Sequence, residues 1–400
     1  MGEQCAAVYA AKRRETERRR YPRPRMTNPD DRMLWIRNLK GDVVSDGFDA
    51  IEVEVGSECR INGILDYEDG AILLGASTHD PNNVGLYKYL MKLKLRFQPA
   101  RTLRGKPNGY LFRDGQVGEL VALISLCLQA RLYILSITVG HLTSHGLPIK
   151  TEFSPLRVRF GRNVDPVVFS ATDRNFAIEL PSFLDQVRHV PSEYHLAVAL
   201  SSNHFARALR EIGVDEEMVF VRLVSAIETA ALDQPVIADE LSKKTPGELF
   251  RTEDLTALQI QELKKLLRTR KAKARFIAFL EQFSSGFFEG MPEKPPHTQV
   301  TPTTLASVAG AIYDARSDYL HNGYPMYLSQ FAPAFPEWHM DPSVGMVWQN
   351  RSYAADQKLP RADFFHRLVR HCLLSYFKSL VPGFNGSTAK EGRGGLETEK

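Results

Sequence analysis

Cysteine is scarce in this chain, and the few cysteines lie far apart. Four cysteines occur among 400 residues, and none of them forms a CxxC pair. This pattern excludes a zinc ribbon and a disulfide framework, and it is typical of a protein from a reducing compartment. The start of the chain has too short an apolar run for a secretory signal. We therefore expect a cytoplasmic protein.

Long apolar runs are also missing. The most hydrophobic window, 119–140, is interrupted by Glu119, Gln129 and Arg131. A membrane span would not tolerate these side chains near its middle. We expect a buried helix that runs into a strand here, and no membrane partner.

The signature motifs of several enzyme classes are absent. The sequence has no GxxxxGKS/T loop, no GxSxG elbow and no HExxH helix. The first absence argues against ATP hydrolysis by a P-loop. No helical cluster of His, Cys and Asp has the spacing of metal ligands, so we expect no metal and no cofactor.

Positive charge is concentrated at the start of the chain. Residues 1–25 hold eight Lys and Arg against three Glu, whereas the whole chain carries only +4. Residues 1–30 are therefore predicted to be a disordered basic tail, which either binds nucleic acid through its phosphates or is a solvated leader before a start at Met26 or Met33. The polar residues 383–400 are predicted to be a second disordered tail.

Residues 31–187 are predicted to form an α+β domain with a sensor or regulatory role. Residues 114–130 have helical spacing of apolar side chains, and the segment 85–97 fits either a helix or an amphipathic strand. Short, partly alternating apolar runs separated by Gly and Asp indicate strands. These runs are 33–39, 49–57, 59–67, 71–77, 131–139, 156–161, 166–171 and 176–181.

Residues 190–382 are predicted to form an all-α bundle. Apolar side chains recur there at helical spacing, an acidic first turn begins at Asp215, and Asn322-Gly323 is a helix-ending pair. The Pro-rich and aromatic-rich insert 324–358 is predicted to be a long loop. The expected helices of this antiparallel bundle are 193–210, 215–232, 252–283, 300–323 and 359–380.

Arg316 and His321 stand together where one of these helices ends. On an ideal helix, residues five apart differ by about 140° in direction, so the two side chains would converge only if the last turn unwinds. A guanidinium can hold phosphodiester oxygens, and an imidazole can take a proton from a 2′-OH or give one to a leaving oxygen. The alternative is structural: a helix-end Arg and a capping His.

The segment AIYDARSDYLHNGYP resembles the Arg-x4–6-His signature of the HEPN superfamily, in its Apea-like branch. The helices around 215–232, 252–283 and 359–380 resemble the other helices of that domain in the same order. The resemblance implies a HEPN bundle that dimerises and joins two Arg-His motifs into a metal-independent ribonuclease site. It implies Arg316 as phosphate clamp and His321 as general acid and base. Many members are toxins or anti-phage defence effectors, so the expected partners are RNA, a second copy, and a regulatory protein or phage trigger.

Further polar residues near this motif are candidates for supporting roles. Ser317 follows the arginine, where many HEPN members have a larger polar residue. Asp318 or Asn322 could orient His321. Glu228, in the middle of an otherwise apolar helix, either holds Arg316 or His321 in place or is a solvated helix-face carboxylate.

Basic residues also form one stripe along the predicted helix 252–283. Their spacing of four, three and four places them on one face, which suits a track for RNA phosphates. The alternative is a solvated face of a long helix. These residues are Lys264, Arg268, Lys271 and Arg275.

Two other functions stay open from the sequence. A HEPN bundle could bind RNA, nucleotide or a protein partner without cutting, which the small Ser317 would allow. A nucleotidyltransferase-linked toxin is a third candidate, although the chain has no Gly-Ser-x10-Asp-x-Asp pattern.

Overall fold

The computed structural model shows helices together with an antiparallel sheet, which is the coarse fold class predicted from the sequence. The domain boundaries and the HEPN assignment stay predictions. Both predicted tails lie outside the described part of the chain, as do the strands predicted at 33–39, 59–67, 156–161 and 166–171. The structure describes residues 48–57, 73–74, 78–79, 87–96, 115–140, 149–152, 176–212, 214–233, 272–289, 299–326, 347–348, 351–352 and 359–382.

The sheet is built around β1 (Phe48–Ser57), which pairs antiparallel with β4 (Tyr87–Arg96) and β5 (Tyr133–Gly140). In β4, Tyr89 and Met91 are buried whereas Leu90 between them is exposed, so the ambiguous segment 85–97 is a strand with one buried face. Short strands extend the sheet on both sides. They are β2 (Leu73–Leu74), β3 (Thr78–His79) and β6 (Ile149–Glu152).

The helix α3 (Gly115–Leu128) runs directly into β5, as the apolar window 119–140 predicted. Residues 119–130 are all buried, so this helix is surrounded by other elements rather than by solvent. Among the described residues, no helix has both the length and the apolar character needed to cross a membrane.

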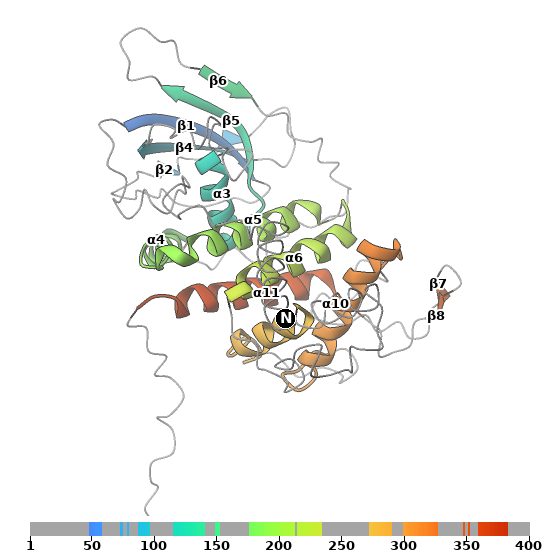
Figure 1. Cartoon of the computed structure of the whole chain (residues 1–400). Coiled ribbons are helices and arrows are strands. Elements are labelled where there is room, and N and C mark those ends of the chain that lie inside the picture. Colours follow the sequence, from blue (N-terminus) through green and yellow to red (C-terminus); the bar gives the residue numbers. More distant parts are fainter. Residues whose placement is uncertain are drawn as a thin grey trace, which may run out of the picture.

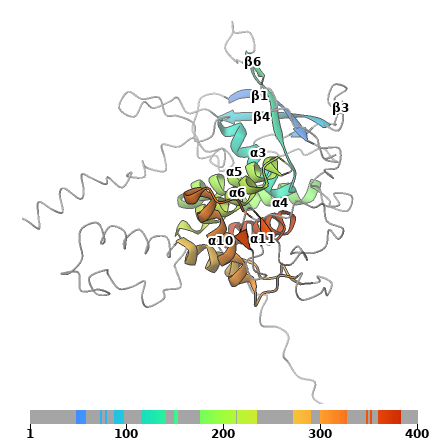
Figure 2. The same cartoon turned by 90° about the vertical axis from the view of Figure 1, so that its right-hand side faces the viewer.

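The elements form layers with α3 between the sheet and the helices. Two perpendicular views show the sheet at one end, α3 beneath it, and the remaining helices below (Figures 1 and 2). One continuous apolar core includes Val53 of the sheet, Leu123 of α3 and Phe365 near the far end of the chain. The helices that follow α3 are α4 (Phe176–Arg188), α5 (His195–Glu211), α6 (Glu216–Ala230), α10 (Leu305–Asn322) and α11 (Ala362–Ser379).

The strand predicted at 176–181 is wrong, because these residues begin α4. Leu180, Leu184 and Val187 are buried at spacings of four and three, which is a helical stripe. The five residues of alternating character before Pro181 were too short a window to reveal that stripe.

The predicted helices of the second half are present with shifted ends. Single 3₁₀ turns, Ser192–Tyr194 and Ala231–Asp233, precede α5 and follow α6. The acidic start of α6 is confirmed, since Asp215 accepts a hydrogen bond from the Met218 amide at 3.0 Å. Only 272–283 of the predicted helix 252–283 is described, and it is helical. The predicted loop 324–358 contains one short strand pair, β7 (Val347–Trp348) with β8 (Arg351–Ser352).

Side chains from α11 form hydrogen bonds at the C-terminal end of α3. The guanidinium of Arg370 donates to the carbonyl oxygens of Leu126 and Cys127, which have no acceptor role left inside their own helix. Next to them Gln129 takes a left-handed conformation, and its amide lies 3.2 Å from Nδ1 of His366. These contacts join residues more than 230 positions apart.

Burial of His366 predicts that stability falls in acid. Burial, with help from nearby arginines, lowers the pKa of His366 to about 3. The unfolded chain takes up a proton near pH 6.5 whereas the folded chain does not, so folding weakens as the pH falls below about 6.5. We expect His366 alone to lower the free energy of unfolding by about 2 kcal/mol between pH 7 and pH 5. Urea unfolding at both pH values measures this.

A His366→Gln variant is the control for that measurement. Glutamine keeps a polar group opposite Gln129 but does not titrate. The pH dependence of the variant should therefore be weaker by most of that amount. Burial and nearby arginines lower the pKa of His204 to about 4. This histidine therefore adds its own loss of stability in acid, which the variant keeps. An unchanged pH dependence in His366→Gln would contradict this assignment.

Candidate functional site

The carboxylate of Glu228 on α6 holds two side chains of α10. Its Oε1 accepts a hydrogen bond from the Tyr313 hydroxyl at 2.8 Å, and its Oε2 accepts one from Nη2 of Arg316 at 2.9 Å. Tyr313 and Arg316 are three residues apart on α10, so they lie on the same side of that helix. The structure therefore brings together Glu228 and Arg316, which are 88 positions apart.

This cluster is half-buried. The exposed fraction of the side chain is 18% for Arg316 and 26% for Glu228. Burial, followed by the hydrogen bond to Glu228, raises the pKa of Tyr313 to about 12, so its hydroxyl stays protonated and donates. The Arg316 guanidinium also lies 5.8 Å from the Tyr313 ring centroid. The carboxylate of Glu228, which the Tyr313 hydroxyl holds in place, and the Tyr313 ring together fix where this guanidinium lies.

The helical residues 272–283 cross α10 at the same place. The rings of Phe276 and Tyr313 lie 5.6 Å apart, and Nζ of Lys273 lies 2.6 Å from a carboxylate oxygen of Asp314. A Cβ at Gly310 would lie 3.5 Å from the Lys273 Cε, which is ordinary van der Waals contact, so this approach does not depend on the glycine.

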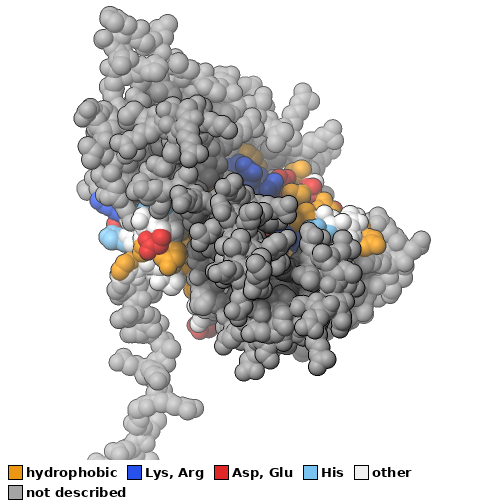
Figure 3. Space-filling view, viewed as in Figure 1, with side chains coloured by type: hydrophobic (Ala, Val, Ile, Leu, Met, Phe, Trp, Pro, Cys, Tyr) orange, Lys and Arg blue, Asp and Glu red, His pale blue; other side chains and the backbone are white. Residues whose placement is uncertain are grey.

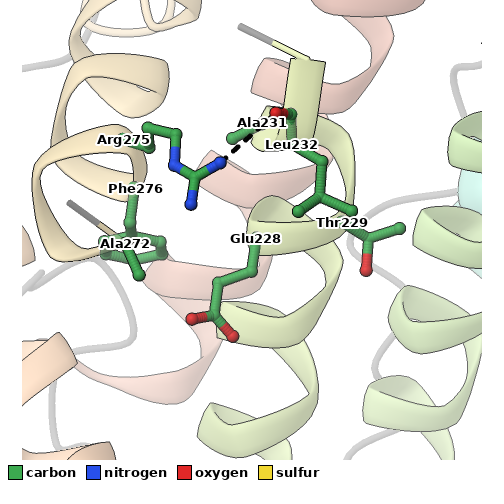
Figure 4. A pocket seen from close by; sticks show the side chains of 7 residues that line it. All are labelled: Glu228, Thr229, Ala231, Leu232, Ala272, Arg275 and Phe276. Carbon is green, nitrogen blue, oxygen red and sulfur yellow. Dashed lines mark hydrogen bonds between the residues drawn. The ribbon is translucent and has the colours of Figure 1, made fainter. Parts of the chain in front are cut away.

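A pocket of about 320 Å³ opens beside Glu228 (Figure 4). Arg275 leans across it and donates to the Leu232 carbonyl oxygen at 3.3 Å. Arg275 therefore lies close to Glu228, whereas Lys264, Arg268 and Lys271 of the same predicted stripe lie outside the described residues. The lining residues are Glu228, Thr229, Ala231, Leu232, Ala272, Arg275 and Phe276.

The end of α10 is a regular helical turn. Gly323 has a φ of 67° and its amide donates to the Tyr319 carbonyl oxygen at 3.1 Å, which is the left-handed ending that Asn-Gly predicted. The helix continues through Asn322, so the unwinding that would bring His321 beside Arg316 does not occur. The two side chains of one chain leave the helix about 140° apart.

The other candidates at this end have separate places. His321 is exposed, and no hydrogen bond to it occurs within the part of the chain that the structure describes. The Asp318 carboxylate accepts a hydrogen bond from the side-chain amide of Asn322 at 3.2 Å, so these two side chains bind one another. Ser317 is half-buried.

Two exposed apolar side chains are near His321 in the sequence. Leu320 and Tyr324 are each 46% exposed, although they neighbour a polar helix end. Apolar side chains and a histidine are visible at the surface where α10 ends (Figure 3). The end of α10 is anchored to the start of α6, since Glu217 accepts from the Met326 amide at 2.7 Å. The sequence did not predict this contact of Glu217, nor the role of Tyr313. The only signal for Tyr313 was its spacing of three residues from Arg316.

Comparisons of the chain with protein-family models, with curated proteins and with solved structures gave no match. Among the described residues, no group of three or more His, Cys, Asp or Glu could hold a metal ion. The comparisons therefore indicate no function, and the cluster around Glu228 is interpreted from its geometry alone.

Replacing Glu228 by Gln should disturb both of its partners. Without the carboxylate, the pKa of Tyr313 should fall from about 12 toward 10, keeping only the part that burial causes. Arg316 would lose its counterion in a half-buried place, which should lower the free energy of unfolding by about 1–3 kcal/mol. NMR titration of labelled tyrosine, assigned with Tyr313→Phe, and urea unfolding measure the two effects. In the control Glu281→Gln, at an exposed carboxylate of the helical residues 272–283, neither quantity should change.

A Gly323→Ala variant tests the ending of α10. Nothing lies within 4 Å of where the new Cβ would be, so the cost is conformational. The left-handed backbone should make the variant less stable by about 1 kcal/mol. Gly323→Asn should lose less, because Asn tolerates this conformation. Equal unfolding midpoints for all three proteins in urea would show that this residue is not held at positive φ.

Proposed function

We propose that the chain is a metal-independent endoribonuclease of HEPN type, with an active site composed from two copies of the chain. One observation carries the proposal: Arg316 is fixed by Glu228 and Tyr313, whereas His321 lies exposed on the same helix end. A positioned guanidinium and an accessible imidazole are the two groups that RNA cleavage without metal requires.

The proposed reaction is an internal transesterification of RNA. His321 takes the proton from a 2′-OH, and the 2′ oxygen forms a bond to phosphorus while the bond to the 5′ oxygen breaks. That oxygen leaves with the proton that His321 took up, so the products are a 2′,3′-cyclic phosphate and a 5′-OH end. Arg316 offsets the charge on the phosphoryl oxygens with Nη1, since Nη2 is bound to Glu228 and Nε is buried.

A second copy is needed because one chain cannot direct both groups at one phosphate. The angle between Arg316 and His321 on a regular helix supports this. Leu320 and Tyr324 supply exposed apolar area on either side of His321, where a partner helix could pack. Contact around α10 would place His321 of one copy near Arg316 of the other.

The biological role that we propose is that of a toxin or an anti-phage defence effector. The part of the chain that contains the sheet would sense a trigger or restrain the nuclease. Arg275, beside the pocket at Glu228, would contact RNA phosphate near the site.

A second candidate is a HEPN module that binds RNA, nucleotide or a protein partner without cutting. The observation in its favour is that Arg316 already has a carboxylate partner in its own chain. An arginine in such an ion pair fits a structural role as well as a catalytic one.

Cleavage of RNA in excess EDTA tests the proposal. We expect purified protein to cut total RNA containing tRNA, and to leave 2′,3′-cyclic phosphate and 5′-OH ends. His321→Ala and Arg316→Ala should each lose at least about 100-fold in rate, as general acid-base and electrostatic groups do. Mixing the two inactive variants should restore part of the activity, because a mixed dimer keeps one complete site.

Two matched variants control for folding. His189→Ala removes another exposed histidine, and Arg361→Ala removes an arginine of similar exposure that pairs with Asp363 at 2.9 Å. Both should cut like the wild type. Loss of cleavage in EDTA, or equal cleavage by all variants, would overturn the assignment. RNA binding without cleavage by the wild type would favour the second candidate.

A further inference from the structure

A cationic cluster lies on the hairpin of α5 and α6. His204 and Arg207 are on α5, and Arg222 is on α6. The two helices pack along their length and are joined by a short turn, so they run antiparallel. His204 and Arg222 each lie about two helical turns from that turn, which places them side by side.

The charges of both arginines act on the His204 ring. The pKa of His204 is lowered to about 4, first by burial, then by the charge of Arg222 and then by that of Arg207. Both guanidiniums therefore lie within electrostatic reach of the ring. At neutral pH the ring is uncharged, so it can accept with one nitrogen and donate with the other.

These cations lack the partners that other arginines in the chain have. Within the described ranges, neither Arg207 nor Arg222 forms an ion pair or a hydrogen bond. Nε of Arg222 and Nδ1 of His204 are both buried without a hydrogen-bond partner. By contrast, six other half-buried or buried arginines each have a carboxylate or carbonyl partner, although Nε of Arg131 and of Arg316 is also buried without one. Those arginines are Arg131, Arg210, Arg316, Arg361, Arg367 and Arg370.

Such an arrangement is costly unless an anion completes it. Partly buried cations that face one another repel, and a buried polar nitrogen without a partner costs about 1–3 kcal/mol. Most buried polar groups in proteins have a hydrogen-bond partner, and a bound ion is one way to supply a missing one. Two guanidiniums and an imidazole offer more donors than one carboxylate can accept, whereas a phosphate has enough oxygens for all of them.

We propose that His204, Arg207 and Arg222 form a binding site for a phosphate group. The phosphate belongs either to a small molecule, such as inorganic phosphate or a nucleotide, or to the backbone of RNA. The site does not depend on the nuclease proposed above, because no residue is shared. The half-buried face of α6 that carries Arg222 continues through Ser225 to Thr229, which lines the pocket beside Glu228. An RNA strand bound at both places would follow this face.

Thermal unfolding of the full chain with inorganic phosphate is the first test. We expect millimolar phosphate to raise the Tm of the wild type, and chloride at the same ionic strength to have little effect. Arg207→Gln and Arg222→Gln should lose this increase. Without phosphate these variants should be at least as stable as the wild type, because each removes an unpaired cation. Lys378→Gln, which removes a distant exposed cation, should keep the full increase.

Binding of a short RNA oligonucleotide distinguishes the two sources of phosphate. A peptide nucleic acid of the same sequence, which has no phosphates, is the control. If the phosphate comes from RNA, Arg222→Gln should weaken RNA binding several-fold and reduce the slope of log affinity against log salt by about one. If it comes from a small molecule, RNA binding should be unchanged while the Tm response to phosphate is lost.

The His204 ring provides a direct readout. Phosphate should shift its NMR signals, assigned with His204→Asn, and raise its pKa, since a nearby anion favours the imidazolium. The proposal is overturned if phosphate stabilises wild type and both arginine variants equally, or if neither phosphate nor RNA responds to the arginine substitutions. Neither result bears on cleavage, so failure here is separate from failure of the nuclease.

Discussion

The half-buried carboxylate of Glu228 is the constraint on which the arrangement of the helices around it depends. A carboxylate removed from water must be paired and hydrogen-bonded, and Tyr313 and Arg316 supply both from α10. Tyr313 in turn packs on Phe276, so the helical residues 272–283 are placed by the same contact. One charged group on α6 thereby fixes the position of two other helices.

A second carboxylate on α6 repeats this arrangement at the other end of the helix. Glu217 accepts from the Met326 amide just beyond the end of α10. Glu217 and Glu228 are eleven residues apart, which is about 16 Å along α6. Two attachments at that separation fix the direction of α10 as well as its position, so the exposed end with His321 is held by the chain rather than left free.

The sequence predicted features that depend on neighbouring residues. The path from α3 into β5 followed from the charges within 119–140, and the end of α10 followed from Asn322-Gly323, because each is decided within a few residues. The partners of Glu228 could not be derived in this way. They are 85 and 88 positions away, and only the packing of α6 against α10 brings them together. The same is true of Arg275. The spacing of basic residues could not predict that it donates a hydrogen bond to the Leu232 carbonyl oxygen.

The regular end of α10 decides what kind of active site the chain could have. Five residues of helix separate Arg316 and His321 by about 7.5 Å along the axis as well as by 140° around it. A single phosphodiester is too small to be reached from both directions in one chain. The proposed chemistry therefore uses a second copy, with Nη2 of Arg316 bound to Glu228, Nε buried, and Nη1 directed at the phosphate. If the two groups never meet across such a seam, the contact to Glu228 is sufficient to explain why an arginine is at this position.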